Sequence, residues 1–498
     1  MSDSIHELSE RPEREKSDDR HSESHSGHAL EVFERPRGIR GLYSHPTTQI
    51  VMLGFVCFMC PGLFNALNGL GAGGQVDSTV SANANSALYA TFAVAAFFAG
   101  SINNKLGSRV TLFLGSIGYS LYIGAFLATN IHPHASPFIL AAGAVLGICA
   151  GLLWTAQGSL MMSYPTESEK GKHIGLFWSI FNMGGVVGAA VSLGENFNSK
   201  KNSVSNGTYI AFLALTLVGT TLPLLMVNPR NMIRTDGTKV TAPRHPSWRT
   251  EFYGLWVALR TDPLICLLFP MFFASNWFYT WQFNGYNGAL FNIRTRSLNN
   301  FVYWLAQIVG SLSIGFLLDQ TVLSRRFRAF SGWAILMIMI FVVHPWAYTY
   351  QRDYTRASMP PGDADKMDFS SNGYAGHVWL YIFCGLLDSM WQTTAYWLMG
   401  AMSNDPAKLA HFAGFYKSMQ SAGAAGVWRG DAVKLPYMNL FLSTWILLVT
   451  GLVFALPMIH LRVKEHTVIE DETLARMDEA GHIRPSDYEE TTTPPPTK

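Results

Sequence analysis

The sequence is poor in charged residues. Its 36 Lys and Arg and 34 Asp and Glu make up 14% of the 498 residues, against about 25% in soluble proteins. About 17 of these charges lie in residues 1–45 and about 14 in residues 462–498, so the segment between is only about 9% charged. This deficit excludes an ordinary soluble enzyme and indicates a membrane protein. The net charge of +2 also excludes the strongly basic surface that nucleic-acid binding requires.

Cysteine is scarce as well, and all five cysteines lie in apolar runs (Cys57, Cys60, Cys149, Cys266 and Cys384). A thiol in such surroundings behaves as a small hydrophobe, so we expect neither a disulfide scaffold nor a metal site. The sequence contains no phosphate-binding Gly-Lys-Ser/Thr loop, no His-Glu-x-x-His and no Gly-x-Ser-x-Gly motif. We therefore expect no enzyme activity, no cofactor and no ATP-driven pump.

Twelve long apolar runs follow the polar amino-terminal segment, and each ends at charges, Gly or Pro. The first six are residues 48–70, 87–103, 110–129, 137–163, 172–194 and 208–228. The second six are residues 263–284, 300–318, 328–347, 376–400, 410–428 and 437–461. The pattern predicts an all-α membrane protein with twelve transmembrane helices and both tails on one side.

Positive charge in the loops predicts which side that is. Lys and Arg, among them Lys105, Arg109, Arg325 and Arg326, are more frequent in the loops on the side of the tails. Since cationic loops are retained in the cytoplasm, both termini are predicted to be cytosolic, in the plasma membrane or an endomembrane. The Asn206-Gly207-Thr208 sequon then faces the other side, and Asn206 is a candidate glycosylation site.

Two sequence echoes indicate a duplication. Gly100–Arg109, after the second run, is echoed by Gly315–Asp319 after the eighth, and Gly175–Ser179 is echoed by Gly414–Ser418. We therefore predict two six-helix halves, as in parallel-repeat transporters. The predicted domains are a disordered cytosolic tail (1–45), the first half (46–228), a cytosolic linker (229–262), the second half (263–461) and a second disordered tail (462–498).

The Gly-x-x-x-Asn/Asp-Lys-x-Gly-x-Arg signature at Gly100–Arg109 and the six-plus-six layout resemble the major facilitator superfamily. The segments Phe58–Gly71 and Phe412–Gln420 are similar to the fungal branch of the Unc-ninety-three-like family, which is named after an ion-channel-regulatory membrane protein. This resemblance covers about residues 40–465 and implies a facilitator fold, with activity either as a transporter or as a regulator of partner proteins. It also implies a gating role for Gly100, Asn104, Lys105, Gly107, Arg109, Gly315 and Asp319. Asn104 stands where the family motif usually has Asp.

Polar residues within the apolar runs indicate a central site. Pro61 and Pro270 interrupt the first and seventh runs at corresponding positions, which in transporters points to a binding site at the midplane. The candidate substrate-binding residues are Asn65, Asn68, Trp154, Gln157, Asn182, Asn276, Gln282 and Asn284. Amides in hydrocarbon need a polar partner, so the alternative is that they only join helices. We interpret the aromatic end of the seventh run, Trp277 to Tyr286, as an interfacial belt rather than a substrate cage.

Two ionisable residues lie within apolar runs. Asp388 and Lys417 differ in depth by only about 5 Å, so neighbouring antiparallel helices would let them pair. Gln392 and Gln420 extend the same polar faces. We predict that these four residues couple transport to an ion, with Asp388 taking up a proton or cation and Lys417 holding its charge in the empty state. The alternative is a fixed structural ion pair.

The predicted function is therefore secondary transport of a small solute or ion, driven by an ion gradient through alternating access. The rival hypothesis is a non-transporting subunit that regulates or traffics an ion channel or another membrane protein. The two hypotheses imply different partners within the lipid bilayer, a small-molecule or ion substrate for the first and a membrane protein for the second.

Overall fold

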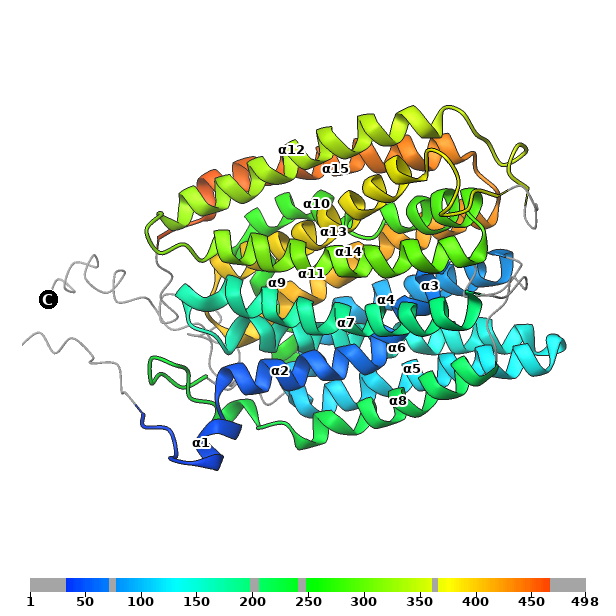
Figure 1. The fold of residues 1–498 in the computed structure, drawn as a ribbon. Helices are drawn as coiled ribbons and strands as arrows, with labels where there is room; N and C mark the ends of the chain where they lie inside the picture. The colour runs from blue at the N-terminus through cyan, green and yellow to red at the C-terminus, as the bar shows by residue number, and fades with distance from the viewer. Residues whose placement is uncertain (1–32, 71–77, 198–205, 241–247, 361–365, 466–498) are drawn as a thin grey trace, which may run out of the picture.

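The computed structural model describes residues 33–70, 78–197, 206–240, 248–360 and 366–465, which form a bundle of long, roughly parallel helices (Figure 1). Among these residues, β-pairing is limited to two isolated bridges, Ile233 with Lys239 and Phe291 with Met367. Most of the two predicted tails lies outside the described residues.

Helices cover all six apolar runs of the first half. The first run forms α2 (Pro46–Cys57), a π-helical turn (Phe58–Gly62) and α3 (Leu63–Gly69). Pro61 lies inside the π-helical turn because it has no amide hydrogen for the regular helical bond. The short α1 (Ile39–Tyr43) precedes them, and α4 (Ser78–Leu106), α5 (Ser108–Ile131), α6 (Ser136–Ser163), α7 (Lys170–Asn196) and α8 (Asn206–Leu225) follow.

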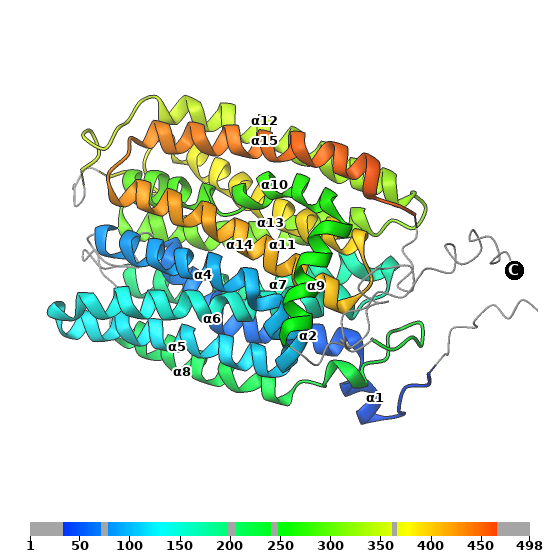
Figure 2. The same ribbon diagram turned by 180° about the vertical axis from the view of Figure 1, so that it is seen from behind.

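The second half begins with a broken segment. Its α9 (Trp248–Thr261) lies within the predicted linker and is bent by 79° from the segment Pro263–Ala274, so it runs across one end of the bundle (Figure 2). The seventh run comprises a 3₁₀-helix (Pro263–Leu268), α10 (Phe269–Ala274), which starts around Pro270, and a π-helix (Thr280–Gly288). The remaining runs form α11 (Ile293–Leu318), α12 (Arg325–Gln351), α13 (Tyr374–Met402), α14 (Pro406–Ala432) and α15 (Tyr437–Arg462).

Eight helices of the described chain are long and apolar enough to cross a membrane, and the bent pair at α9 and α10 would make a ninth. The apolar part of α8, Tyr209–Leu225, is shorter. The helices α13 and α14 are long but richer in polar side chains, including Asp388 and Lys417. The prediction of a helical, multi-pass membrane protein is confirmed.

The two halves of the chain lie side by side, with α2–α8 on one side and α10–α15 on the other in both views (Figures 1 and 2). They meet where α4 packs against α14 and α7 packs against α11. We call the end of the bundle that carries α1, α9 and the last turn of α15 the linker end, and the other end the opposite end.

The aromatic segment after Pro270 differs from its predicted place at the membrane interface. Trp281, Phe283 and Tyr286 are at most 3% exposed. Trp281 packs on Phe441 and Tyr286 on Tyr381. The interpretation as an interfacial belt is wrong for these three residues, because α11, α14 and α15 pack against the π-helix that carries them.

Candidate functional site

A cavity of about 50 Å³ lies between the two halves of the chain. This volume holds a few water molecules. Its polar wall residues are Asn65, Asn276, Gln392, Lys417 and Gln420, and its aromatic ones are Phe64, Tyr89, Phe92, Tyr119, Trp154, Trp178, Phe181 and Tyr279. Both halves of the chain therefore contribute to one mixed polar and aromatic wall.

The structure divides the predicted substrate-binding residues into two groups. Asn65, Trp154 and Asn276 line the cavity, whereas Asn68, Gln157, Asn182, Gln282 and Asn284 lie outside its wall. Gln157 accepts a hydrogen bond from the Tyr396 hydroxyl at 3.2 Å, and Asn284 donates one to Asp431 at 2.8 Å. These two amides join helices, which is the alternative considered for them.

Lys417 presents its ammonium to three aromatic rings, of which that of Trp154 belongs to the cavity wall. Its Nζ donates to Gln420 Oε1 at 2.8 Å and lies 4.5, 4.8 and 5.3 Å from the ring centroids of Trp154, Tyr416 and Tyr396. The side chain is only 3% exposed. A cation over aromatic faces is stabilised by the ring quadrupoles, and more strongly where water is excluded.

Asp388 is held by donors from a different helix. Its Oδ2 accepts hydrogen bonds from the Tyr303 hydroxyl at 3.0 Å and from Gln307 Nε2 at 2.6 Å, both on α11. The same Tyr303 hydroxyl lies 2.8 Å from Gln282 Oε1. Tyr303 and Gln307 were not among the site residues predicted from the sequence. Gln307 is an amide within an apolar run, so the criterion that selected Asn182 would also have selected it.

The expected direct pairing of Asp388 with Lys417 is absent from the ion pairs of the described residues. Instead, Gln392 Nε2 donates to Asp388 Oδ1 at 3.4 Å, and Gln420 Nε2 donates to Gln392 Oε1 at 3.1 Å. Asn276 Oδ1 accepts from both glutamines, at 3.2 and 2.9 Å. The two charges lie on one hydrogen-bonded chain, because Asp388 turns toward α11 while Lys417 turns toward Trp154 on α6.

Asn182 is unusual among the predicted site residues. It is 1% exposed, and both polar atoms of its amide lack a hydrogen-bond partner among the described residues. Gly175, two turns before it on α7, and Gly185, one turn after it, face α11, since a Cβ on Gly175 would contact Ser311 and one on Gly185 would contact Trp304. Asn182 therefore lies at the seam between the two halves, outside the cavity wall.

Several predicted gating residues join the halves at the linker end. Asn104 donates to Glu251 of α9 at 3.3 Å and to the Ala407 carbonyl of α14 at 3.4 Å. Gly100 permits α4 to approach α14, because a Cβ there would lie 2.9 Å from the Ala410 carbonyl. Burial raises the pKa of Glu251, on the α9 helix that runs across the linker end of the bundle, to about 7.

Asp319 makes the corresponding contact from the second half. Its carboxylate accepts hydrogen bonds from the backbone amides of Gly171, at 2.7 Å, and Lys172, and so caps the start of α7. A Cβ on Gly315 would lie 2.6 Å from the Gly171 carbonyl, so this glycine permits the approach. Burial raises the pKa of Asp319, which ends α11, to about 6.

The other predicted gating residues lie on the first half. Arg109 donates to the Leu224 carbonyl at the end of α8. Gly107, with a φ of 81°, makes the turn between α4 and α5 that a side chain would strain. Lys105 lies in the last turn of α4, and the positive charge there opposes the rise in the pKa of Glu251.

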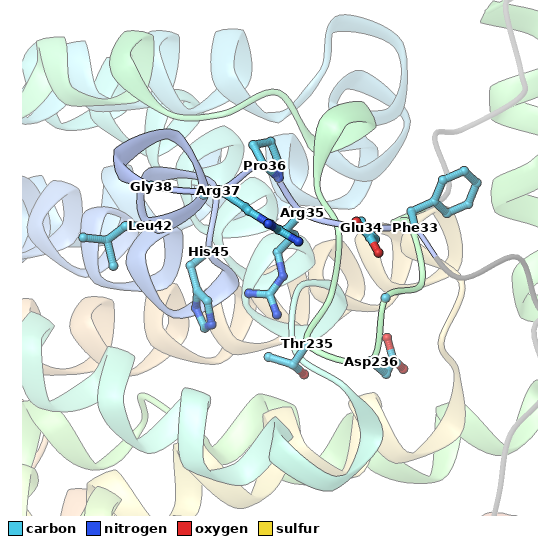
Figure 3. Close-up of a pocket in the computed structure, with 12 residues that line it drawn as sticks. Phe33, Glu34, Arg35, Pro36, Arg37, Gly38, Leu42, His45, Thr235 and Asp236 are labelled. Atoms are coloured by element: carbon cyan, nitrogen blue, oxygen red, sulfur yellow. The ribbon is translucent and has the colours of Figure 1, made fainter.

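A larger pocket, of about 620 Å³, lies on the surface at the linker end (Figure 3). Arg35 and His45 project into it from the segment before α2, opposite Thr235 and Asp236. Its wall contains none of the candidate residues, and Asn65 lies about 30 Å further along the first transmembrane segment. The pocket is therefore separate from the central cavity.

Comparison with known proteins now identifies the family. Residues 74–456 match the profile of the family described as ion channel regulatory protein UNC-93. The chain belongs to the UNC-93 family. Among its relatives, UNC93-like protein C922.05c of Schizosaccharomyces pombe is 46% identical over 445 residues, which are 89% of this chain and 88% of that protein. UNC93-like protein 1 of Arabidopsis thaliana is 41% identical over 425 residues, 85% of this chain and 92% of that protein.

The solved structures that resemble this UNC-93 family chain include transporters of the major facilitator superfamily. The proton:xylose symporter XylE superposes with a TM-score of 0.60 and 12% sequence identity, over 85% of this chain and 96% of the symporter. Such a low identity shows the fold alone. The UNC-93 family chain thus has the fold of the major facilitator superfamily, and the predicted family is confirmed.

Proposed function

We propose that this UNC-93 family chain is a secondary transporter that moves a small solute by alternating access, driven by a proton gradient. In this proposal its twelve transmembrane helices form two six-helix halves that rock around the central cavity. The observation that carries the proposal is the hydrogen-bonded chain from the cavity wall to the buried Asp388. Proton binding neutralises a carboxylate that is costly to keep charged inside the bundle, and the chain connects that event to the cavity.

Contacts between the halves at both ends support alternating access. At the linker end, Lys170 of α7 donates to the Gly400 and Ser403 carbonyls at 2.6 and 3.1 Å. At the opposite end, Asn300 of α11 donates to the Ala66 carbonyl at 3.1 Å, and Arg296 donates to the Leu70 carbonyl at 2.9 Å. In this proposal, the contacts at the linker end close the cavity on that side, and the contacts at the opposite end close it on the other. A solute enters from one side when the contacts at that end separate and those at the other end stay formed.

Proton uptake into reconstituted vesicles tests the proposal. Vesicles with an entrapped pH dye are given a panel of neutral and charged metabolites under an imposed proton gradient. We expect solute-dependent proton uptake by the wild-type protein, a loss of at least about tenfold in Asp388→Asn, and no change in Asp353→Asn, whose carboxylate is 73% exposed. Wild-type rates in Asp388→Asn would contradict proton coupling through this residue.

The proposal places the linker end in the cytosol, in the plasma membrane or an endomembrane. The opposite end then carries Asn206, an exposed residue at the start of α8 whose side chain accepts from Asn130 at 2.6 Å. If Asn206 is glycosylated there, glycosidase treatment shifts the mobility of the wild-type protein and leaves Asn206→Gln unchanged. Glycosylation of a sequon introduced into either tail would contradict this orientation.

The family description favours a second candidate function, regulation or trafficking of an ion channel or another membrane protein. The exposed aromatic face of α9, with Trp248, Phe252 and Trp256 at least 44% exposed, is available for such a contact. The vesicle assay separates the two functions. Absence of flux for every solute, together with a stoichiometric membrane-protein partner that co-purifies, supports regulation over transport.

A further inference from the structure

Two buried lysines of the bundle differ in how their charge is satisfied. The Nζ of Lys170 donates to three oxygen atoms, the carbonyls of Gly400 and Ser403 and the side chain of Asn404, at 2.6 to 3.1 Å. Among the described residues, the Nζ of Lys417 donates to one oxygen, that of Gln420, and otherwise faces aromatic rings. An ammonium has three donors, so Lys417 keeps donors for a further acceptor while Lys170 is saturated by the protein.

The position of Lys417 makes those donors available to a solute. Lys417 belongs to the cavity wall, and no carboxylate of the described residues lies within 4 Å of its ammonium. Asn65, in the same wall, makes no hydrogen bond within the described part of the chain, so a second polar group faces the cavity without a partner. A cation and an amide in one wall match the two oxygens of a carboxylate.

The balance of charges around the cavity also favours an anionic solute. Asp388 and Lys417 together are neutral, and a proton on Asp388 leaves Lys417 as the uncompensated charge of the chain Asp388–Gln392–Gln420–Lys417. A single negative charge in the cavity restores neutrality within a low-dielectric interior. An anion and a proton would therefore bind together more favourably than either alone.

The aromatic part of the wall selects the body of the solute. Trp154 packs edge-on against Phe181 at 5.2 Å, and Phe64 packs against Tyr119 at 5.8 Å. Gln392, Gln420 and Asn276 already bind one another, so their amides are not free to bind the hydroxyls of a sugar. A cavity of about 50 Å³ admits a body of only a few atoms, and larger ones need the halves to separate.

We propose that the cavity binds a small monocarboxylate with an apolar body and that Lys417 is the counter-charge of its carboxylate group. The bound monocarboxylate then crosses the membrane together with the proton accepted by Asp388. This inference rests on the proposed transport function for its last part. The binding site itself can be tested without any gradient.

The test is calorimetric binding to the full-length protein in lipid nanodiscs at pH 6. The probes are acetate and benzoate, beside acetamide and benzamide, which have nearly the same shape without the charge. We expect the wild-type protein to bind the carboxylates and not the amides. Lys417→Gln should bind benzoate about ten- to a hundredfold more weakly, the loss of one hydrogen bond to a charged group. Lys417→Arg keeps the charge and should retain part of the affinity.

Lys434→Gln is the matched control, because this exposed lysine lies at the opposite end and donates to Thr79 at 3.3 Å. This variant should bind benzoate as the wild type does. Equal affinity for benzoate and benzamide, or unchanged benzoate binding in a folded Lys417→Gln, would overturn the inference. If Lys417→Gln does not fold, the inference is tested by comparing the affinities for benzoate and benzamide in the wild type and in Lys417→Arg. If benzoate binds but no proton-driven flux occurs, the transport function is contradicted and the carboxylate site is not. If other solutes are transported but benzoate does not bind, the carboxylate site is contradicted and the transport function is not.

Discussion

Asn104 donates its side-chain amide to the buried carboxylate of Glu251, 3.3 Å away, and so joins α4 to the linker helix α9. Facilitator motifs usually have Asp at the position of Asn104. A second carboxylate beside Glu251 would repel it, whereas the amide supplies a donor. In this UNC-93 family chain the carboxylate that meets Asn104 therefore comes from α9.

The docking of α9 should depend on pH through Glu251. Its pKa is about 7 in the docked helix, against an ordinary value of 4.5, so the docked state binds the proton more tightly than the released state. Docking is therefore most favourable below pH 4.5, weakens by up to about tenfold per pH unit as the pH rises toward 7, and then levels off. Hydrogen exchange of residues 248–261 between pH 5 and 8, corrected for the intrinsic rate, measures this dependence.

The matched variant for this prediction is Glu251→Gln, which keeps the shape and cannot ionise. Exchange in its α9 should be independent of pH, while Glu34→Gln, a change at an exposed position, should behave as the wild type does. Identical pH dependence in the wild type and Glu251→Gln would show that another group controls docking.

Removal of the Asp319 cap should open the linker end. Asp319→Ala leaves the Gly171 and Lys172 amides at the start of α7 without their acceptor, at a cost of about 1–2 kcal/mol. A cysteine placed at the buried Ser159 should then react about five- to thirtyfold faster with a membrane-permeant maleimide. Gln320→Ala, at the next residue, is the control. An unchanged labelling rate in Asp319→Ala would show that this cap does not hold the halves together.

Asn300→Ala should open the other end of the bundle, the opposite end. This substitution removes the bond from α11 to the Ala66 carbonyl near the end of α3, worth about 0.5–1.5 kcal/mol. The opposite end should open more often, so a cysteine at cavity residue 65 should react faster with a membrane-impermeant reagent added from that side. The same reporter should react more slowly from that side in Asp319→Ala, and equal effects of both variants would contradict alternating access.

Gln307 should stabilise the charge of Asp388. Gln307→Leu removes the donor 2.6 Å from Oδ2 and should lower the free energy of unfolding by about 1.5–3 kcal/mol, the value of a hydrogen bond to a charged group. Thermal unfolding in detergent measures the change, and a double-mutant cycle with Asp388→Asn isolates the pair. If the cost of Gln307→Leu is the same in the Asp388→Asn background, Gln307 acts through packing and not through the carboxylate.

Much of the fold followed from local patterns. Each predicted run became a helix or a broken helical segment, because a backbone in lipid must satisfy its own hydrogen bonds over about 20 residues, and that demand is written in consecutive side chains. The family was also recognisable, since the motif at Gly100–Arg109 and the segment Phe58–Gly71 are contiguous. Of the predicted substrate-binding residues, Asn65, Trp154 and Asn276 line the cavity.

The partners of the charged residues followed only from packing. Depth along the helix axis can be counted from the sequence, and it placed Asp388 and Lys417 at one level. Rotation of each helix about its axis depends on many distant side chains together, and it turned Asp388 toward Tyr303 and Lys417 toward Trp154. The same holds for Glu251, whose contact with Asn104 joins segments 147 residues apart. Spacing along the chain reports the level of a residue in the membrane, and three-dimensional packing alone determines what that residue meets there.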